Sequence, residues 1–152
     1  MSVTYIHGDL EKKLRNIVGN NAPKAQYALD TQIMNDMKPY MPLQTGNFQN
    51  LTAARSAALA GSGKVCAATT VYGRFLYKGK KMKNAATGKG PMRIVLDTGE
   101  VIFRWPRGSR LVATDEPLSY SRKQAKPEWY DEAKRAHFND WKKLVKRRIT
   151  NG

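Results

Sequence analysis

The chain has little of the side-chain chemistry on which disulfide frameworks, zinc sites and most hydrolytic centres depend. Its 152 residues include one cysteine, Cys66, and two histidines, His7 and His137, near opposite ends. A single thiol excludes an intramolecular disulfide and any cysteine-based zinc site, because each needs several thiols. We interpret Cys66 as a small hydrophobic residue in an apolar run, and the histidines as surface or helix-packing residues.

Acidic residues are also scarce, with 12 Asp and Glu against 27 Lys and Arg. A metal-dependent nuclease needs two or three converging carboxylates or histidines, and the sequence offers no evident set. The segment Gly61-Ser62-Gly63-Lys64 has Ala58 and Val65 where a phosphate-binding loop needs a glycine and a hydroxyl residue. We therefore expect no enzyme activity, no bound metal and no cofactor. A small magnesium-dependent nuclease is the weakest alternative.

Long apolar runs are missing as well. No window approaches the roughly 20 apolar residues of a membrane span, and the first residues lack the basic end and apolar stretch of a signal peptide. We expect synthesis in a cytoplasm and no membrane contact. Hydrophobic residues still make up 41% of the chain, which is enough for a core, so we expect a single domain over residues 1–152.

Apolar periodicity predicts helices at both ends of the chain. The spacing favours a helical pair over residues 9–38, with a break at Gly19 and with Pro23 in the first turn of the second helix, whose apolar residues are Tyr27, Ile33, Met34 and Met37. A long helix is predicted over residues 127–149. Acidic residues in its first turns and basic residues near its end suit the helix dipole.

Strands are predicted between the helices. Two prolines and Gly46 indicate a connector over residues 39–47, and we expect a hairpin and an aromatic segment over 48–77, although the alanines of the first arm also suit a helix. Residues 78–93 read as a long exposed basic loop, 94–103 as a clear hairpin, and 104–115 as irregular chain. The predicted class is α+β, an antiparallel sheet with hairpins covered by N-terminal helices and a long C-terminal helix.

The excess of cations gives a formal net charge of +15, and two segments concentrate it. Residues 74–93 carry seven cations and no acid, and residues 122–148 carry ten cations against four acids. Such a density of cations attracts DNA phosphates or an acidic protein ring. The alternative is that these cations form a solvated face that keeps the protein soluble. No base-reading motif is present, so any DNA contact is expected to be independent of sequence. The candidate contacts are Lys78, Lys80, Lys81, Lys83, Lys89 and Arg93.

Three motifs follow one another in a recognisable order. The first is Pro-x-x-Thr-Gly (Pro42, Thr45, Gly46), and the second is Tyr-x-x-Phe-Leu-Tyr-x-Gly (Tyr72, Phe75, Leu76, Tyr77, Gly79). The third pairs Pro-Leu-x-Tyr-Ser with a later Trp-Tyr-x-x-Ala-Lys (Pro117, Leu118, Tyr120, Ser121, Trp129, Tyr130, Ala133, Lys134). Over roughly residues 9–148 the chain resembles the minor capsid protein family of tailed phages and prophages of Gram-positive bacteria. That family is similar in pattern to the phage neck and tail-completion superfamily.

The resemblance implies a structural virion protein at the head–tail junction, made in the bacterial host cytoplasm and assembled as a hexameric or dodecameric ring around the DNA channel. It implies head-closure or connector proteins and tail-terminator or tail-tube proteins as partners, with non-specific contact to packaged double-stranded DNA. The first motif would then shape the corner between helix and sheet, and Tyr72, Phe75 and Tyr77 would pack the sheet against the helices. A sequence-independent DNA-binding module for packaging or regulation is the alternative function.

Two tryptophans, Trp129 and Trp141, belong to the predicted C-terminal helix. If the ring of Trp141 is part of the core, Trp141→Ala is expected to cost about 3 to 5 kcal/mol. A cost under about 1 kcal/mol would place this side chain on an assembly interface instead.

Overall fold

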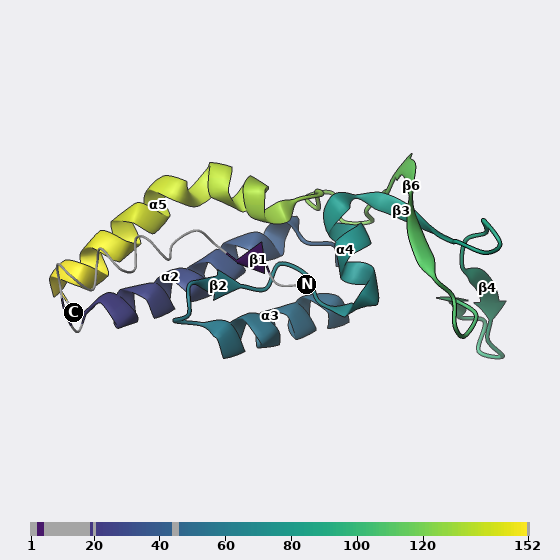
Figure 1. Cartoon of the computed structure of the whole chain (residues 1–152), viewed down its shortest axis with the longest axis horizontal. Coiled ribbons are helices and arrows are strands. Elements are labelled where there is room, and N and C mark those ends of the chain that lie inside the picture. Colours follow the sequence, from purple (N-terminus) through teal and green to yellow (C-terminus); the bar gives the residue numbers. More distant parts are fainter. Residues whose placement is uncertain (1–2, 5–18, 20, 44–45, 152) are drawn as a thin grey trace.

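A computed structural model describes residues 3–4, 19, 21–43 and 46–151 of the chain. The molecule is elongated, with helices gathered at one end and β-ribbons extending from the other (Figure 1). We call the helical end, together with β1 (Val3–Thr4) and β2 (Lys64–Val65), the body. Residues 80–117, which contain the remaining strands, are called the β-arm.

The body is organised around the pairing of α2 (Asn21–Met37) with α5 (Trp129–Asn151). The apolar side chains of α2 recur every three or four residues and are buried, among them Leu29, Ile33 and Met37. The helices run antiparallel, because Asn21 at the start of α2 donates its amide to the carbonyl of Ile149 near the end of α5. Both predicted helices are confirmed.

The predicted helical pair differs from the structure at Tyr27. Tyr27 is 57% exposed, so its expected place on the apolar face of α2 is wrong. The stripe at residues 22, 25, 29 and 33 points to the core instead, and Tyr27 lies outside it. The first helix of the pair, predicted over residues 9–18, lies outside the described residues.

The hairpin predicted over residues 48–77 is wrong. A short 3₁₀ turn, η1 (Lys38–Tyr40), leads to helix α3 (Asn47–Leu59), and the aromatic segment forms helix α4 (Thr70–Lys78). The alanine-rich sequence of α3 has high helix propensity. Its inward side carries two hydroxyl side chains that have partners within the chain: Thr52 hydrogen-bonds to Thr69, and Ser56 hydrogen-bonds to the backbone of Cys66. These internal partners replace the strand pairing that the alternation suggested.

The residues predicted as a basic loop contain regular structure. Strand β3 (Lys80–Asn84) pairs antiparallel with β6 (Leu111–Pro117), and β4 (Met92–Val95) pairs with β5 (Val101–Arg104). The hairpin predicted over 94–103 is therefore confirmed, but the loop over 78–93 and the irregular chain over 104–115 are wrong in part. The strand that pairs with β3 lies about thirty residues further along the chain, so no pattern of neighbouring residues predicts this pairing.

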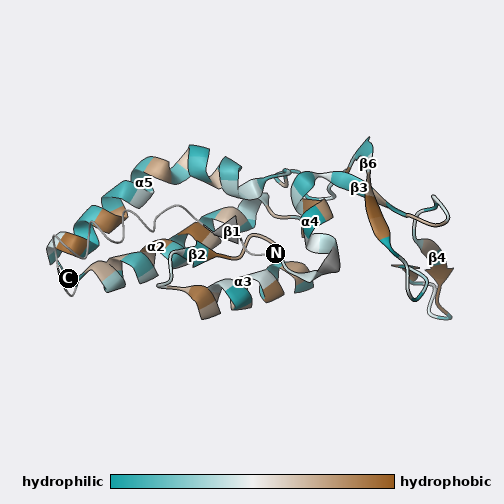
Figure 2. Ribbon diagram, viewed as in Figure 1, coloured by the Kyte–Doolittle hydropathy of each residue, from teal (hydrophilic) through white to brown (hydrophobic). Residues whose placement is uncertain are grey.

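The α+β class is confirmed, with the strands of the described residues arranged in three two-stranded sheets. The sheet of β1 and β2 lies in the body, where Val3 pairs with Val65. The other two sheets make up the β-arm, and α4 contacts β3 where the arm leaves the body. Figure 2 shows apolar residues both between the helices and on the strands of the arm. The core itself is centred on α2, α5 and the buried ring of Trp129.

Candidate assembly interface

The second and third sequence motifs meet where the β-arm joins the body. The Tyr120 hydroxyl donates to the carbonyl of Leu76 at 2.5 Å, and the amide of Leu118 donates to the carbonyl of Gly79 at 2.7 Å. The amide of Glu128 donates to the carbonyl of Tyr77, also at 2.7 Å. We call this region, residues 76–79 with 117–129, the junction. Its hydrogen bonds tie the end of α4 to the chain that leads into α5.

Gly79 has a special conformation in the junction. It ends α4 with a φ of +66°, a left-handed conformation that favours glycine. A Cβ at this position would lie 2.8 Å from the Cβ of Pro127. The motif glycine therefore allows both the turn into β3 and the close approach of the segment before α5.

Aromatic rings anchor the junction to the core. The ring of Tyr77 lies edge-on to Trp129 at a centroid distance of 4.8 Å, and the ring of Phe48 does so at 5.9 Å. The indole of Trp129 donates to the carbonyl of Ala67 at 2.8 Å. Phe75 is buried as well, whereas Tyr72 is 42% exposed. The motif aromatics thus pack α4 among helices rather than a sheet against helices.

The first motif comes just before α3 in the chain. Gly46, with a φ of +77°, precedes α3, and half-buried Pro42 lies between η1 and α3. These two residues form a corner between two helices, where the resemblance implied a corner between helix and sheet. Thr45 lies outside the described residues.

The six candidate cations differ in whether they have a partner within the chain. Lys78 on α4 pairs with Glu128 at 3.3 Å, Lys81 on β3 pairs with Glu116 at 3.0 Å, and Lys80 donates to the carbonyl of Asp115 at 3.4 Å. Lys83, Lys89 and Arg93 are exposed on β3, the following turn and β4. Half of the predicted set is therefore already bonded within the chain.

The outer hairpin of the β-arm exposes large apolar side chains. Its exposed large hydrophobic residues are Met92, Val95, Leu96, Val101 and Phe103, and Phe103 is 60% exposed. The register pairs Arg93 with Phe103 and Val95 with Val101, so these four share one face of the ribbon. A lone two-stranded hairpin is marginally stable in water. This face is suited to be covered by another molecule.

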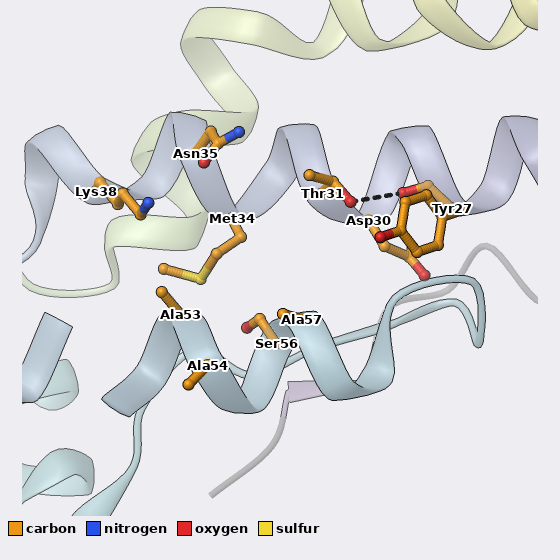
Figure 3. A pocket seen from close by; sticks show the side chains of 10 residues that line it. All are labelled: Tyr27, Asp30, Thr31, Met34, Asn35, Lys38, Ala53, Ala54, Ser56 and Ala57. Atoms are coloured by element: carbon orange, nitrogen blue, oxygen red, sulfur yellow. Dashed lines mark hydrogen bonds between the residues drawn. The ribbon is translucent and has the colours of Figure 1, made fainter. Parts of the chain in front are cut away.

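A cleft of about 350 Å³ separates α2 from α3 (Figure 3). Its wall is made largely of small or apolar side chains such as Met34, Ala53 and Ala57, and it includes the carboxylate of Asp30. That carboxylate accepts a hydrogen bond from the Gln26 amide at 2.7 Å and from the backbone amides of Gly61 and Gly63 at 2.8 and 3.0 Å. Asp30 thus holds the Gly61–Gly63 turn against α2, which is a structural role.

Sequence reasoning missed Asp30, and it named Tyr120 in the third motif without assigning it a role. The signal for Asp30 was present, because it is an acid on the apolar face of a helix, one residue after buried Leu29. The partner of Tyr120 could not be predicted from its motif, since its bond to Leu76 joins positions 44 residues apart. Burial raises the pKa of Tyr120 to about 12, which keeps its hydroxyl protonated as a donor.

Within the described ranges, no three His, Cys, Asp or Glu side chains gather as a metal site. None of the helices described is both long and apolar enough to span a bilayer.

A family model described as minor capsid protein matches residues 4–92, more than half of the chain. The chain belongs to the minor capsid protein family. Membership makes it a structural protein of the phage virion. The matched range ends at the start of β4, so Tyr120 and Trp129 lie outside it although they bond to residues inside it. No curated protein and no solved structure matches the chain.

Proposed function

We propose that this minor capsid protein is a head–tail joining subunit, a neck, connector or tail-completion component that forms a hexameric or dodecameric ring around the DNA channel. Its partners are the head-closure or connector proteins on one side and the tail-terminator or tail-tube proteins on the other. The protein acts as an architectural component, and no residue is assigned a catalytic role.

The observation that supports this proposal best is the apolar face at the tip of the β-arm. Phe103, Val95 and Val101 lie exposed together on a ribbon that has no helix packed over it in the described structure. Exposed apolar clusters with an adjacent cation, here Arg93 on the same face, are typical of surfaces that another protein covers. An elongated arm is also the shape expected of a part that reaches a neighbour.

The difference between arm and body supports a ring. A two-fold dimer uses the same patch on both copies, whereas a ring uses two different patches that meet head to tail. The β-arm tip and the helical body are unlike each other in structure, and the arm places its tip far from the body (Figure 1). A contact from the arm of one copy to a different surface of the next is heterologous, and such contacts close into rings when the rotation permits.

The test is the composition and architecture of purified virions of the phage whose genome encodes this chain. Quantitative mass spectrometry is expected to give a copy number per particle that matches a hexamer or a dodecamer, and cryo-electron microscopy is expected to place the density between head and tail. A copy number near that of the main shell protein, or absence from finished particles, would refute the proposal.

A further inference from the structure

We infer that the outer face of the C-terminal half of α5 binds the phosphate backbone of duplex DNA without sequence preference. Four cations form this face: Lys142, Lys143, Lys146 and Arg147. We call it the α5 basic face. It differs from the candidate set on α4 and the β-arm, which the sequence alone singled out.

The helix geometry separates these four cations from the core. Trp141 and Val145 are buried against the rest of the body, whereas all four cations are exposed. Because an α-helix turns once in 3.6 residues, positions 142 and 146 form one row and 143 and 147 form a second. The two rows lie side by side over about 7.5 Å of helix axis at a rise of about 1.5 Å per residue.

Acidic neighbours of the α5 basic face are few. Residues 141–151 contain five cations and no acid. The nearest acid along the helix, Asp140, lies 3.8 Å from His137, and Asp36 accepts a hydrogen bond from the Trp141 indole. Both carboxylates lie in the groove between α2 and α5 that Lys143 and Arg147 border. Within the described part of the chain, none of the four cations forms an ion pair, in contrast to Lys78 and Lys81.

The absence of an apolar centre favours DNA over protein as the ligand. Protein interfaces have an apolar core with a polar rim, and the tip of the β-arm has that character. The α5 basic face has cations without such a core. The nearest exposed aromatic ring, Phe138, lies at its edge with Lys142 at 5.0 Å and Lys134 at 5.9 Å from the ring centroid. Cations that neutralise phosphates need no apolar anchor.

The α5 basic face and the apolar face of the β-arm lie on different parts of the molecule. Helix α5 forms one edge of the body with α2 between it and α3, and the β-arm leaves the far end (Figure 1). The inference rests on the proposed function for its setting, because a ring around DNA needs a surface toward the channel besides the two patches that contact its neighbours. The β-arm provides one of the neighbour patches, and the α5 basic face provides the surface toward the channel.

The test measures binding of the full chain to a random-sequence duplex of about 24 base pairs by fluorescence anisotropy, between about 50 and 200 mM salt. The first variant carries Lys142→Gln, Lys143→Gln, Lys146→Gln and Arg147→Gln. The matched control removes four exposed arm cations: Lys83→Gln, Lys89→Gln, Arg93→Gln and Arg107→Gln. Both variants lose the same net charge, and all eight positions are exposed. Circular dichroism confirms that both remain folded.

We expect the first variant to lose at least tenfold in affinity at about 100 mM salt. The steepness of the plot of log K against log salt is expected to decrease by about 3 to 4, because each neutralised phosphate contributes about 0.9 to the slope. The control is expected to change affinity less than threefold. Equal losses in both variants, or a larger loss in the control, would overturn the inference. Displacement of the duplex by poly-L-glutamate at equal charge would overturn it in favour of an acidic protein as the ligand.

The outcome is separable from that of the proposed function. Unaltered DNA binding by the first variant refutes the α5 basic face, while virion composition can still place the protein in the neck. Conversely, a wild-type dissociation constant below about 10⁻⁶ M at physiological salt would mean tighter binding than non-specific DNA contacts ordinarily give. Such tight binding combined with absence from virions would support the DNA-binding module and refute the neck subunit, with the α5 basic face retained.

Discussion

Single residues decide how the β-arm is attached to the body. Gly79 takes a left-handed conformation, Tyr120 caps a carbonyl at the end of α4, and Trp129 fills the space between Tyr77 and Phe48. These residues are distant in sequence but contact the same turn. A change at any of them is expected to affect both the stability of the body and the orientation of the arm.

Gly79→Ala is expected to destabilise the protein by about 2 to 4 kcal/mol. A left-handed conformation costs an L-residue about 1 to 2 kcal/mol, and the new Cβ would clash with Pro127 at 2.8 Å. Gly61→Ala is the matched control, because Gly61 has a φ of +91° but its Cβ would lie 3.7 Å from the Tyr27 ring, an ordinary contact. Urea unfolding measures both. An equal loss in the two variants would remove the close approach to Pro127 from the explanation.

Tyr120 is expected to make the free energy of unfolding depend on pH in the alkaline range. Burial raises its pKa to about 12 from an ordinary value of 10, so the unfolded chain loses this proton first. Between these values the folded state binds more protons, and stability falls as pH rises. Urea unfolding between pH 9.5 and 11.5 is expected to show a shallower fall in Tyr120→Phe than in the wild type. Tyr72→Phe, which removes an exposed hydroxyl, is the control, and identical slopes for wild type and Tyr120→Phe would contradict the assignment.

At the scale of elements, α5 combines a buried stripe with a charged outer face. Trp141 is 2% exposed and its indole donates to Asp36 at 2.7 Å, so it belongs to the core rather than to an assembly surface. Trp141→Ala is expected to cost about 3 to 5 kcal/mol in equilibrium unfolding. The same substitution at half-buried Trp105 in the arm is expected to cost less than half of that. A cost under about 1 kcal/mol at Trp141 would refute its place in the core.

The outer hairpin of the arm is the element on which assembly is expected to depend. Phe103→Ser removes the largest exposed apolar side chain of this hairpin without creating a cavity, so the stability of the isolated protein is expected to change by less than about 0.5 kcal/mol. In a phage that carries Phe103→Ser, we expect electron microscopy to show packaged heads without tails. Phe138→Ser removes an exposed phenylalanine from α5 and is expected to leave assembly intact. Normal tailed particles with Phe103→Ser would show that this face is not covered.

The elements also show where local patterns succeed. Helices α2 and α5 and the hairpin of β4 and β5 depend on near neighbours, and periodicity or a short turn predicted each of them. Helix α3 was ambiguous because alanines between polar residues satisfy either pattern. Its helical state depends on Thr69 and Cys66, which supply partners for the inward hydroxyls of Thr52 and Ser56.

At the scale of the whole molecule, stability is expected to be uneven. The core lies in the body, and most residues of the outer hairpin are exposed. Local unfolding follows the density of buried contacts, so backbone amides of β4 and β5 are expected to exchange with solvent at least 100-fold faster than those in the middle of α2. Hydrogen–deuterium exchange with mass spectrometry measures both. Equal protection in the isolated protein would show that the arm is stable without a neighbour.

Composition, periodicity and short motifs are sufficient to predict the α+β class, the two long helices, the outer hairpin, the excess of positive charge and the family. The remaining features depend on contacts between distant segments. The pairing of β3 with β6 and the contact of Tyr120 with α4 join segments that are far apart in sequence. Only the folded chain also shows that Lys78 and Lys81 pair with nearby acids, whereas the four cations of the α5 basic face form no ion pair among the described residues. Charge is read from sequence, but pairing depends on distance in space.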